Sequence, residues 1–200
     1  MLIWIFILPP TSRLMGLRYT PKSEPLQAPD FILPGVDERS WSLANVMGRN
    51  GLVVMFICNH CPYVKSIMKA LVSDARRLQK IGVNAVAIMS NDVAEYPEDS
   101  FDNMRRVADR YQFPFPYLYD ESQQIARAYG AVCTPDFFGL DAHGVLRYRG
   151  RLDAAGIQES NDDYRRDLVL AMKEWVETGQ ITTEQHPSMG CSIKWKTETN

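Results

Sequence analysis

Two nearly uninterrupted runs of apolar residues stand out along the chain and predict buried strands. Residues 53–58 read V-V-M-F-I-C, and residues 83–89 read V-N-A-V-A-I-M. Such runs are typical of strands that are covered on both faces of a sheet. Between them, apolar residues recur at helical spacing over residues 64–78, and Gly82 follows at the position of a helix cap. The pattern therefore predicts a strand–helix–strand unit, with a helix of about four turns that starts at the end of the first strand.

Weaker patterns on either side of this unit predict the rest of the domain. In chain order we expect a strand at 31–33 with a hairpin partner at 39–43, a helix at 101–111, a strand at 117–119, a helix at 121–129, a hairpin of strands 137–140 and 145–148, and a helix at 164–176. Alternating strands and helices followed by an antiparallel hairpin predict an α/β domain. Its mixed central sheet should carry helices on both faces and an N-terminal β-hairpin extension.

The domain itself is expected to span residues 16–180. Residues 1–8 are apolar and precede two prolines, but this run is too short to span a bilayer and lacks a basic segment before it. We therefore interpret residues 1–15 as a disordered extension or a misassigned start, and expect no stable membrane anchor. Residues 181–200, which include Cys191, lack a clear period and are predicted to form a polar tail.

Composition narrows the class of protein. Two hundred residues, 46% of them hydrophobic, suit one domain with a full core. A net charge of −2 provides no basic field for binding nucleic acid. The four cysteines, at positions 58, 61, 133 and 191, are too few for a disulfide-stapled secreted fold. They indicate working thiols, and we expect a cytoplasmic protein.

The first candidate for chemistry is the motif Cys58-Asn59-His60-Cys61, which stands where the first strand meets the helix. The free N–H groups and partial positive charge of a helix N-terminus stabilise a thiolate. A protonated His60 would favour the thiolate further, although an exposed loop histidine without a partner is an equally good interpretation. We expect Cys58 to be the accessible attacking thiolate. Cys61, one turn inside, should be a buried resolving thiol with a raised pKa.

A CxxC motif between a strand and a helix is typical of thiol redox proteins, but other interpretations stay open. The pair could be half of a zinc site or two structural cysteines. The sequence contains neither a second CxxC nor an H-x₃₋₅-H pair, which argues against zinc. A metal-handling module would combine Cys58 and Cys61 with His60 or Cys191. The sequence favours a dithiol that forms a reversible disulfide and needs neither a cofactor nor a resident metal.

Four separate stretches resemble one family of proteins. F-I-C-N-H-C-P-Y-V-K stands at 56–65, N-D-V-A-E-Y-P-E-D-S at 91–100, C-T-P-D-F-F at 133–138 and G-C-S-I-K-W at 190–195. Together they resemble bacterial thioredoxin-family proteins of the peroxiredoxin-like branch, the alkyl hydroperoxide reductase and thiol-specific antioxidant type. The resemblance implies a thioredoxin-like fold. In that fold Thr134 and Pro135 form a cis-proline loop, which faces the CxxC motif and holds the substrate backbone.

The resemblance also implies an activity and partners. It implies a thiol–disulfide oxidoreductase in which Cys58 is the nucleophile and Cys61 is the resolving thiol. The substrate would be a protein or small-molecule disulfide or a peroxide, and the reductant a dithiol system such as thioredoxin or glutathione. Some peroxiredoxins use a C-terminal cysteine across a dimer interface, so a homodimer with Cys191 in that role is a further expectation.

Departures from the family patterns leave a second activity open. Cys61 stands in the register of the peroxidatic cysteine of the T-x-x-C-P motif in peroxiredoxins, but Cys58 replaces the threonine that helps to position peroxide. The alternative is therefore a thiol peroxidase with Cys61 as its peroxidatic residue. Cys133 and Cys191 are candidates for additional redox thiols. The simpler interpretations are a buried small apolar residue for Cys133 and a tail thiol without function for Cys191.

Overall fold

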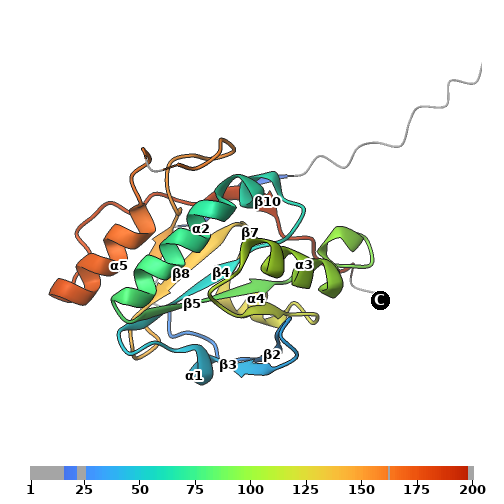
Figure 1. The fold of residues 1–200 in the computed structure, drawn as a ribbon, viewed down its shortest axis with the longest axis horizontal. Helices are drawn as coiled ribbons and strands as arrows, with labels where there is room; N and C mark the ends of the chain where they lie inside the picture. The colour runs from blue at the N-terminus through green and yellow to red at the C-terminus, as the bar shows by residue number, and fades with distance from the viewer. Residues whose placement is uncertain (1–15, 22–25, 162, 198–200) are drawn as a thin grey trace, which may run out of the picture.

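A five-stranded mixed sheet forms the centre of the fold (Figure 1). The computed structural model describes residues 16–21, 26–161 and 163–197. β5 runs parallel to β4 and to β6, whereas β8 runs antiparallel to β4, and β9 antiparallel to β8. The mixed sheet and the thioredoxin-like fold expected from the sequence are confirmed. In spatial order its strands are β6 (Tyr117–Tyr119), β5 (Val83–Met89), β4 (Gly51–Phe56), β8 (Asp136–Leu140) and β9 (Leu146–Gly150).

Helices and a hairpin cover the sheet on both faces, as predicted. One face carries the helices α2 (Pro62–Lys80), α3 (Phe101–Tyr111) and α5 (Asp167–Thr178). The opposite face carries α1 (Leu43–Val46), α4 (Gln124–Tyr129) and the antiparallel hairpin of β2 (Ile32–Pro34) and β3 (Ser40–Ser42). In Figure 1, α2 and α5 accordingly lie on the left side of the sheet, and the hairpin lies below it.

The central strand β4 contributes to both cores because successive side chains of a strand point to opposite faces. Val53 and Met55 pack in the core under α2, α3 and α5. Val54 and Phe56 pack in the second core, under α4 and the hairpin. Each position of this strand is therefore apolar, which explains the uninterrupted run in the sequence.

Two helices begin later than predicted. α4 begins at Gln124, because Gln123 adopts a left-handed conformation (φ 62°) that interrupts a right-handed helix. α5 begins at Asp167 and not near residue 164. Its N-cap residue, Arg166, extends its side chain to α2, where it forms an ion pair of 2.6 Å with the buried Asp74. The side chain of Gln123 likewise donates to the carbonyl oxygens of Ser90 and Lys194. Contacts with distant segments thus hold the residues before both helices, and apolar periodicity does not reveal such contacts.

The segment predicted as a polar tail contains a buried strand, so that prediction is wrong for its central part. β10 (Met189–Ser192) lies between β1 (Leu17–Tyr19) and β7 (Cys133–Thr134) in a three-stranded antiparallel sheet. Gly190 permits this close pairing, since a Cβ atom there would lie 2.0 Å from the carbonyl oxygen of Thr134. A strand of four residues that includes a glycine shows too little alternation to be recognised from the sequence.

The prediction for residues 1–15 falls outside the part of the chain that the structure describes, and it stays a prediction. Within the described part, none of the helices combines the length and the apolar character that crossing a bilayer requires.

Candidate active site

The CxxC motif occupies the loop between the central strand β4 and helix α2. β4 ends at Phe56, two residues earlier than predicted, and α2 extends over 19 residues with Cys61 as its N-cap. Both thiols are buried: 1% of Cys58 and 0% of Cys61 is exposed. The predicted difference in access between them is wrong. The Thr134 hydroxyl lies 3.3 Å from the sulfur of Cys58, and a carboxylate oxygen of Asp99 lies within 4.8 Å of it.

Three thiols gather around Thr134. Cys58 Sγ lies 3.3 Å from the Thr134 hydroxyl, and Cys61 Sγ lies 3.2 Å from the Thr134 carbonyl oxygen. Cys191, paired with Thr134 across β7 and β10, brings its Sγ to 3.1 Å from Cys61 Sγ. The Thr134–Pro135 peptide bond is cis. The cis-proline loop implied by the resemblance therefore does face the CxxC motif, and a third thiol joins the pair.

Hydrogen bonds favour the thiolate form at Cys61 among the thiols of this cluster. The sulfur of Cys61 is hydrogen-bonded to Cys191 (3.1 Å) and to Cys58, and these contacts, which can donate to a Cys61 thiolate, hold the pKa of Cys61 well below the usual value for a thiol. The N–H of Val64, in the first turn of α2, adds to this effect. Burial acts in the opposite direction, as does the Thr134 carbonyl, which only accepts hydrogen bonds. Donation to Cys61 in turn raises the pKa of Cys191.

The pKa of Cys58, the predicted nucleophile, is shifted in the direction opposite to that of Cys61. Burial raises the pKa of Cys58 well above its usual value, and its hydrogen bond to Cys61 and the charge of Asp99 raise it further. The environments of the two thiols favour the reverse of the expected order, with the pKa raised at Cys58 and lowered at Cys61, and the assignment of the attacking thiol stays a prediction. The physical cause of the reversed order is the placement of the thiols, since Cys61 and not Cys58 occupies the helix N-cap and is hydrogen-bonded to both other thiols.

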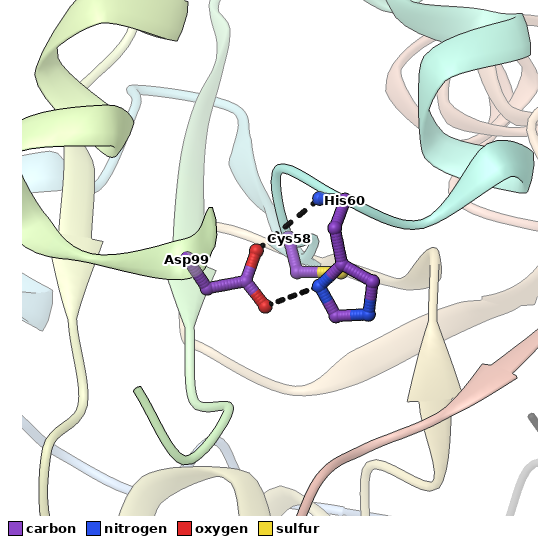
Figure 2. Close-up of side chains that lie close together, drawn as sticks. All are labelled: Cys58, His60 and Asp99. Carbon is purple, nitrogen blue, oxygen red and sulfur yellow. Dashed lines mark hydrogen bonds and ion pairs between the residues drawn. The ribbon is translucent and has the colours of Figure 1, made fainter. Parts of the chain in front are cut away.

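The carboxylate of Asp99 holds the tip of the CxxC loop (Figure 2). Asp99 ends the short helix η1 (Pro97–Asp99) and is fully buried. One oxygen accepts hydrogen bonds from the backbone N–H groups of Asn59 (2.7 Å) and His60 (3.2 Å). The other accepts from the side-chain amide of Asn91 (2.8 Å) and lies 2.7 Å from Nδ1 of His60. Since a carboxylate only accepts, we assign the proton of the His60 ring to Nδ1.

The structure gives His60 two side-chain partners, Asp99 and Tyr96. Its ring pairs with Asp99 and stacks on Tyr96, with ring centroids 5.3 Å apart and an interplanar angle of 11°. Only 13% of the side chain is exposed. His60 is therefore not a partnerless loop histidine. Its contacts fix the conformation of the loop that carries Cys58.

Cys58, His60 and Asp99 also form the one group that the described residues offer for holding a metal ion, with one ligand atom from each within 4.8 Å of the others. The chemistry of these donors fits a metal poorly. A cysteine ligand must be deprotonated, whereas burial favours the protonated form of Cys58. Both oxygens of Asp99 already accept hydrogen bonds. The cluster is better described as a support for the CxxC loop, and we do not carry the metal-handling alternative further.

Asp99 and Tyr96 were not among the site residues expected from the sequence. Both lie in the stretch 91–100, which contributed to the family resemblance without a role for its individual residues. A signal was available, because this stretch follows the strand next to the CxxC strand and begins at the same edge of the sheet. Cys133, in contrast, is confirmed as a buried residue. Its sulfur lies 3.6 Å from the Pro135 carbonyl oxygen, and burial raises its pKa.

A pocket of about 140 Å³ opens beside the cis-proline loop. Its wall includes Pro135, Tyr63 of the first turn of α2, and Ser188, just before β10. Arg151, which also lines it, is held in an ion pair of 2.7 Å with Asp167. The pocket thus lies next to the segments that carry the thiols.

Comparison with known sequences places this site in a family. The sequence model of the AhpC/TSA family matches residues 26–149, which include the CxxC motif and the cis-proline loop. The chain belongs to the AhpC/TSA family. The family resemblance seen in the sequence is thereby confirmed.

Two similar solved structures extend over nearly the whole of this AhpC/TSA family chain. An uncharacterized conserved protein from Geobacillus kaustophilus is 41% identical, with 92% of this chain and 99% of that chain covered and a TM-score of 0.87. A hypothetical protein from Sinorhizobium meliloti 1021 is 37% identical, with 90% and 98% covered and a TM-score of 0.84. Thiol-disulfide oxidoreductase ResA from Geobacillus thermodenitrificans is 28% identical over 120 residues, 60% of this chain. The matched part spans 64% of that relative.

Replacing Gly190 with alanine should separate β10 from β7. The new Cβ would meet backbone atoms of Thr134 and Pro135, which cannot move aside as a flexible side chain would. We expect a loss of about 1–3 kcal/mol in the free energy of unfolding. We also expect a higher pKa for Cys61, because the donor on Cys191 moves away. Urea unfolding and the pH dependence of thiolate ultraviolet absorbance measure the two effects.

Gly16→Ala is the matched control for this substitution. A Cβ at Gly16 would lie 3.8 Å from the Ser192 hydroxyl, an ordinary contact with the same strand. It should leave both measurements unchanged. A Gly190→Ala protein that is as stable as Gly16→Ala would contradict the close pairing of β10.

Proposed function

We propose that this protein is a thiol–disulfide oxidoreductase whose reacting pair is Cys61 and Cys58. The observation that carries the proposal is the position of Cys61, at the N-cap of α2 and 3.1 Å from the sulfur of Cys191, where hydrogen bonds with Cys191 and Cys58 lower its pKa. A thiolate is the attacking group in thiol–disulfide exchange. Both thiols are almost fully buried, so solvent accessibility does not distinguish them. The lower pKa of Cys61 therefore leads us to assign the first attack to this thiol.

The reaction exchanges one disulfide for another. The Cys61 thiolate attacks one sulfur of the substrate disulfide, so a mixed disulfide forms and the other substrate sulfur leaves as a thiolate. Cys58 then gives its proton to that thiolate and attacks Cys61 Sγ. The Cys58–Cys61 disulfide forms, and the second substrate sulfur leaves. Two electrons pass from the dithiol to the substrate.

The remaining roles follow from the contacts of the site. Thr134 and Pro135 would hold the substrate backbone beside the thiols, and the neighbouring pocket would receive part of the substrate. His60, held by Asp99, positions the loop between the thiols. A dithiol system such as thioredoxin or glutathione would restore the reduced form. We assign the reaction to the cytoplasm, where these systems keep thiols reduced. The relative ResA, a thiol-disulfide oxidoreductase by its name, supports this class of activity.

A thiol peroxidase is the second candidate, and the same lowered pKa of Cys61 favours it. In that reaction the Cys61 thiolate attacks a peroxide oxygen and becomes a sulfenic acid, while the other oxygen leaves as hydroxide or alkoxide and is protonated to water or alcohol. Cys58 would then displace water from the sulfenic acid and form the same disulfide. Cys58 stands where peroxiredoxins carry the threonine that positions peroxide, so we place this activity second.

Reduction of insulin disulfides by the full-length protein tests the proposal. With a dithiol reductant in excess, we expect the protein to accelerate insulin reduction well above the rate of the reductant alone. Cys133→Ser is the matched control and should behave as wild type, since Cys133 contacts only the Pro135 carbonyl among the hydrogen-bond partners described. A wild-type protein that leaves insulin oxidised, while peroxide converts Cys61 to a sulfenic acid, would instead assign the peroxidase activity.

A further inference from the structure

Cys61 has a second thiol neighbour besides Cys58. Cys191 Sγ lies 3.1 Å from Cys61 Sγ, although the two residues are 130 positions apart. Only 3% of Cys191 is exposed. Because a disulfide has an S–S distance of about 2.05 Å, the two sulfurs need to approach by only about 1 Å to form one.

The position of Cys191 is fixed by the backbone around it. It pairs with Thr134 across β7 and β10, and its neighbour Gly190 allows β10 to lie against the cis-proline loop. On the other side, Ser192 N–H donates to the Gly16 carbonyl oxygen. Cys191 therefore belongs to a paired strand beside Cys61 and is not a thiol on an unpaired tail.

We propose that Cys191 is a second resolving thiol, so that Cys61 forms its internal disulfide with either Cys58 or Cys191. The inference rests on the proposed function, because it requires Cys61 to be the thiol that enters the mixed disulfide.

The step is balanced in the same way as resolution by Cys58. The Cys191 thiolate attacks Cys61 Sγ of the mixed disulfide, the Cys61–Cys191 bond forms, and the substrate sulfur leaves as a thiolate. The proton of Cys191 passes to the leaving group. Exchange between the two internal disulfides needs no external reagent, since Cys58 can attack Cys61 and release Cys191, or the reverse.

The pKa of Cys191 should fall once Cys61 has formed the mixed disulfide. In the reduced protein, donation to the Cys61 thiolate is the main cause that raises the pKa of Cys191, and burial and the charge on Cys61 add to it. A mixed disulfide at Cys61 carries no charge, so two of these three causes disappear. The ammonium group of Lys194 acts in the opposite direction and favours the Cys191 thiolate in both states. Cys191 thus becomes a better nucleophile when it is needed.

Peptide mapping after oxidation gives the first test. Trypsin leaves Cys58 and Cys61 together in residues 50–65 and Cys191 in residues 174–194. Full-length protein treated with oxidised glutathione should yield a link inside 50–65 and also a link between the two peptides. Cys133→Ser should give the same two products. The linked chain should keep the mass of a single chain on a non-reducing gel, and a covalent dimer would overturn the intramolecular assignment.

Turnover of the serine variants gives the second test. We expect Cys58→Ser to lose at most about tenfold in insulin reduction, because Cys191 still resolves, whereas the Cys58→Ser/Cys191→Ser double variant loses about a hundredfold or more and accumulates the mixed disulfide. Serine at 191 keeps a hydrogen-bond donor to Cys61, so the double variant should retain the low pKa of Cys61. Thiolate absorbance against pH checks this point.

The two proposals fail in different ways. If wild-type protein reduces insulin but Cys58→Ser traps the mixed disulfide as fully as the double variant does, Cys191 is not a resolving thiol and the proposed function stands. If wild-type protein does not reduce insulin, the proposed function fails. The cross-linked peptides then decide the role of Cys191 separately, because a Cys61 sulfenic acid would be resolved by the same two thiols.

Discussion

Cys61→Ser should abolish disulfide reduction while the protein stays folded. Cys61 carries the stabilised thiolate, and a serine hydroxyl does not ionise near neutral pH. We expect the rate of insulin reduction to fall by roughly a thousandfold or more, as it does when other enzymes lose a nucleophile. Serine is among the preferred N-cap residues, so this substitution at the start of α2 should not lower the free energy of unfolding. Insulin reduction and urea unfolding, measured on the same sample, separate chemistry from folding.

The comparison with Cys58→Ser decides which thiol attacks first. If Cys61 is the nucleophile, Cys61→Ser forms no mixed disulfide, and Cys58→Ser retains the low-pKa thiol. The reverse outcome would restore the assignment that the sequence suggested, with Cys58 as the attacking thiol. Cys133→Ser again serves as the control for removing a buried thiol from the same neighbourhood.

Asp99→Ala should destabilise the protein strongly. The Asp99 carboxylate is fully buried and accepts two backbone N–H groups, an amide of Asn91 and the Nδ1–H of His60. Hydrogen bonds to a charged group contribute about 1.5–3 kcal/mol each, and losing several at once leaves buried donors without partners. We expect a decrease of about 4–6 kcal/mol in the free energy of unfolding, a large part of the stability of a typical domain. Urea unfolding at neutral pH provides the measurement.

Asp99→Asn keeps the shape and part of the acceptor capacity, so it serves as the second variant if the alanine protein does not fold. It should lose less stability and should lower the pKa of Cys58, because the negative charge of Asp99 contributes to raising it. The pH dependence of Cys58 alkylation, followed by peptide mass, reports this change. An unchanged pKa would show that burial and Cys61 alone determine the protonation of Cys58.

The fold was predictable from the sequence because its central elements bury apolar residues on both sides. The runs at 53–58 and 83–89 are strands β4 and β5, with the first ending two residues early, and the helix at 101–111 has the predicted bounds. The cis-proline loop was predictable from the resemblance, which links residues 133–138 with the CxxC motif. In each case the information lies in a continuous stretch of sequence.

The distribution of charge in the site was not predictable in the same way. The charge depends on which thiol occupies the N-cap of α2, and β4 ends two residues earlier than the sequence predicts. It also depends on contacts from Cys191 and Asp99. Cys191 lies on a strand too short to show alternation of apolar and polar residues. Asp99 is one of several acidic residues in the stretch 91–100. Contacts between distant segments, which one sequence does not encode as a pattern, determine these features.

The dependence of Cys61 on β10 has a consequence for the chain during synthesis. A ribosome makes the CxxC motif long before it makes residue 191, and β10 pairs with β7 only after residue 191 has emerged. Until then Cys61 lacks the hydrogen bond with Cys191 that contributes most to its low pKa. We therefore expect a higher pKa for the Cys61 thiol of the nascent chain, which falls when β10 docks. Chains released before residue 191 would lack this hydrogen bond and the lowering of the Cys61 pKa that comes with it.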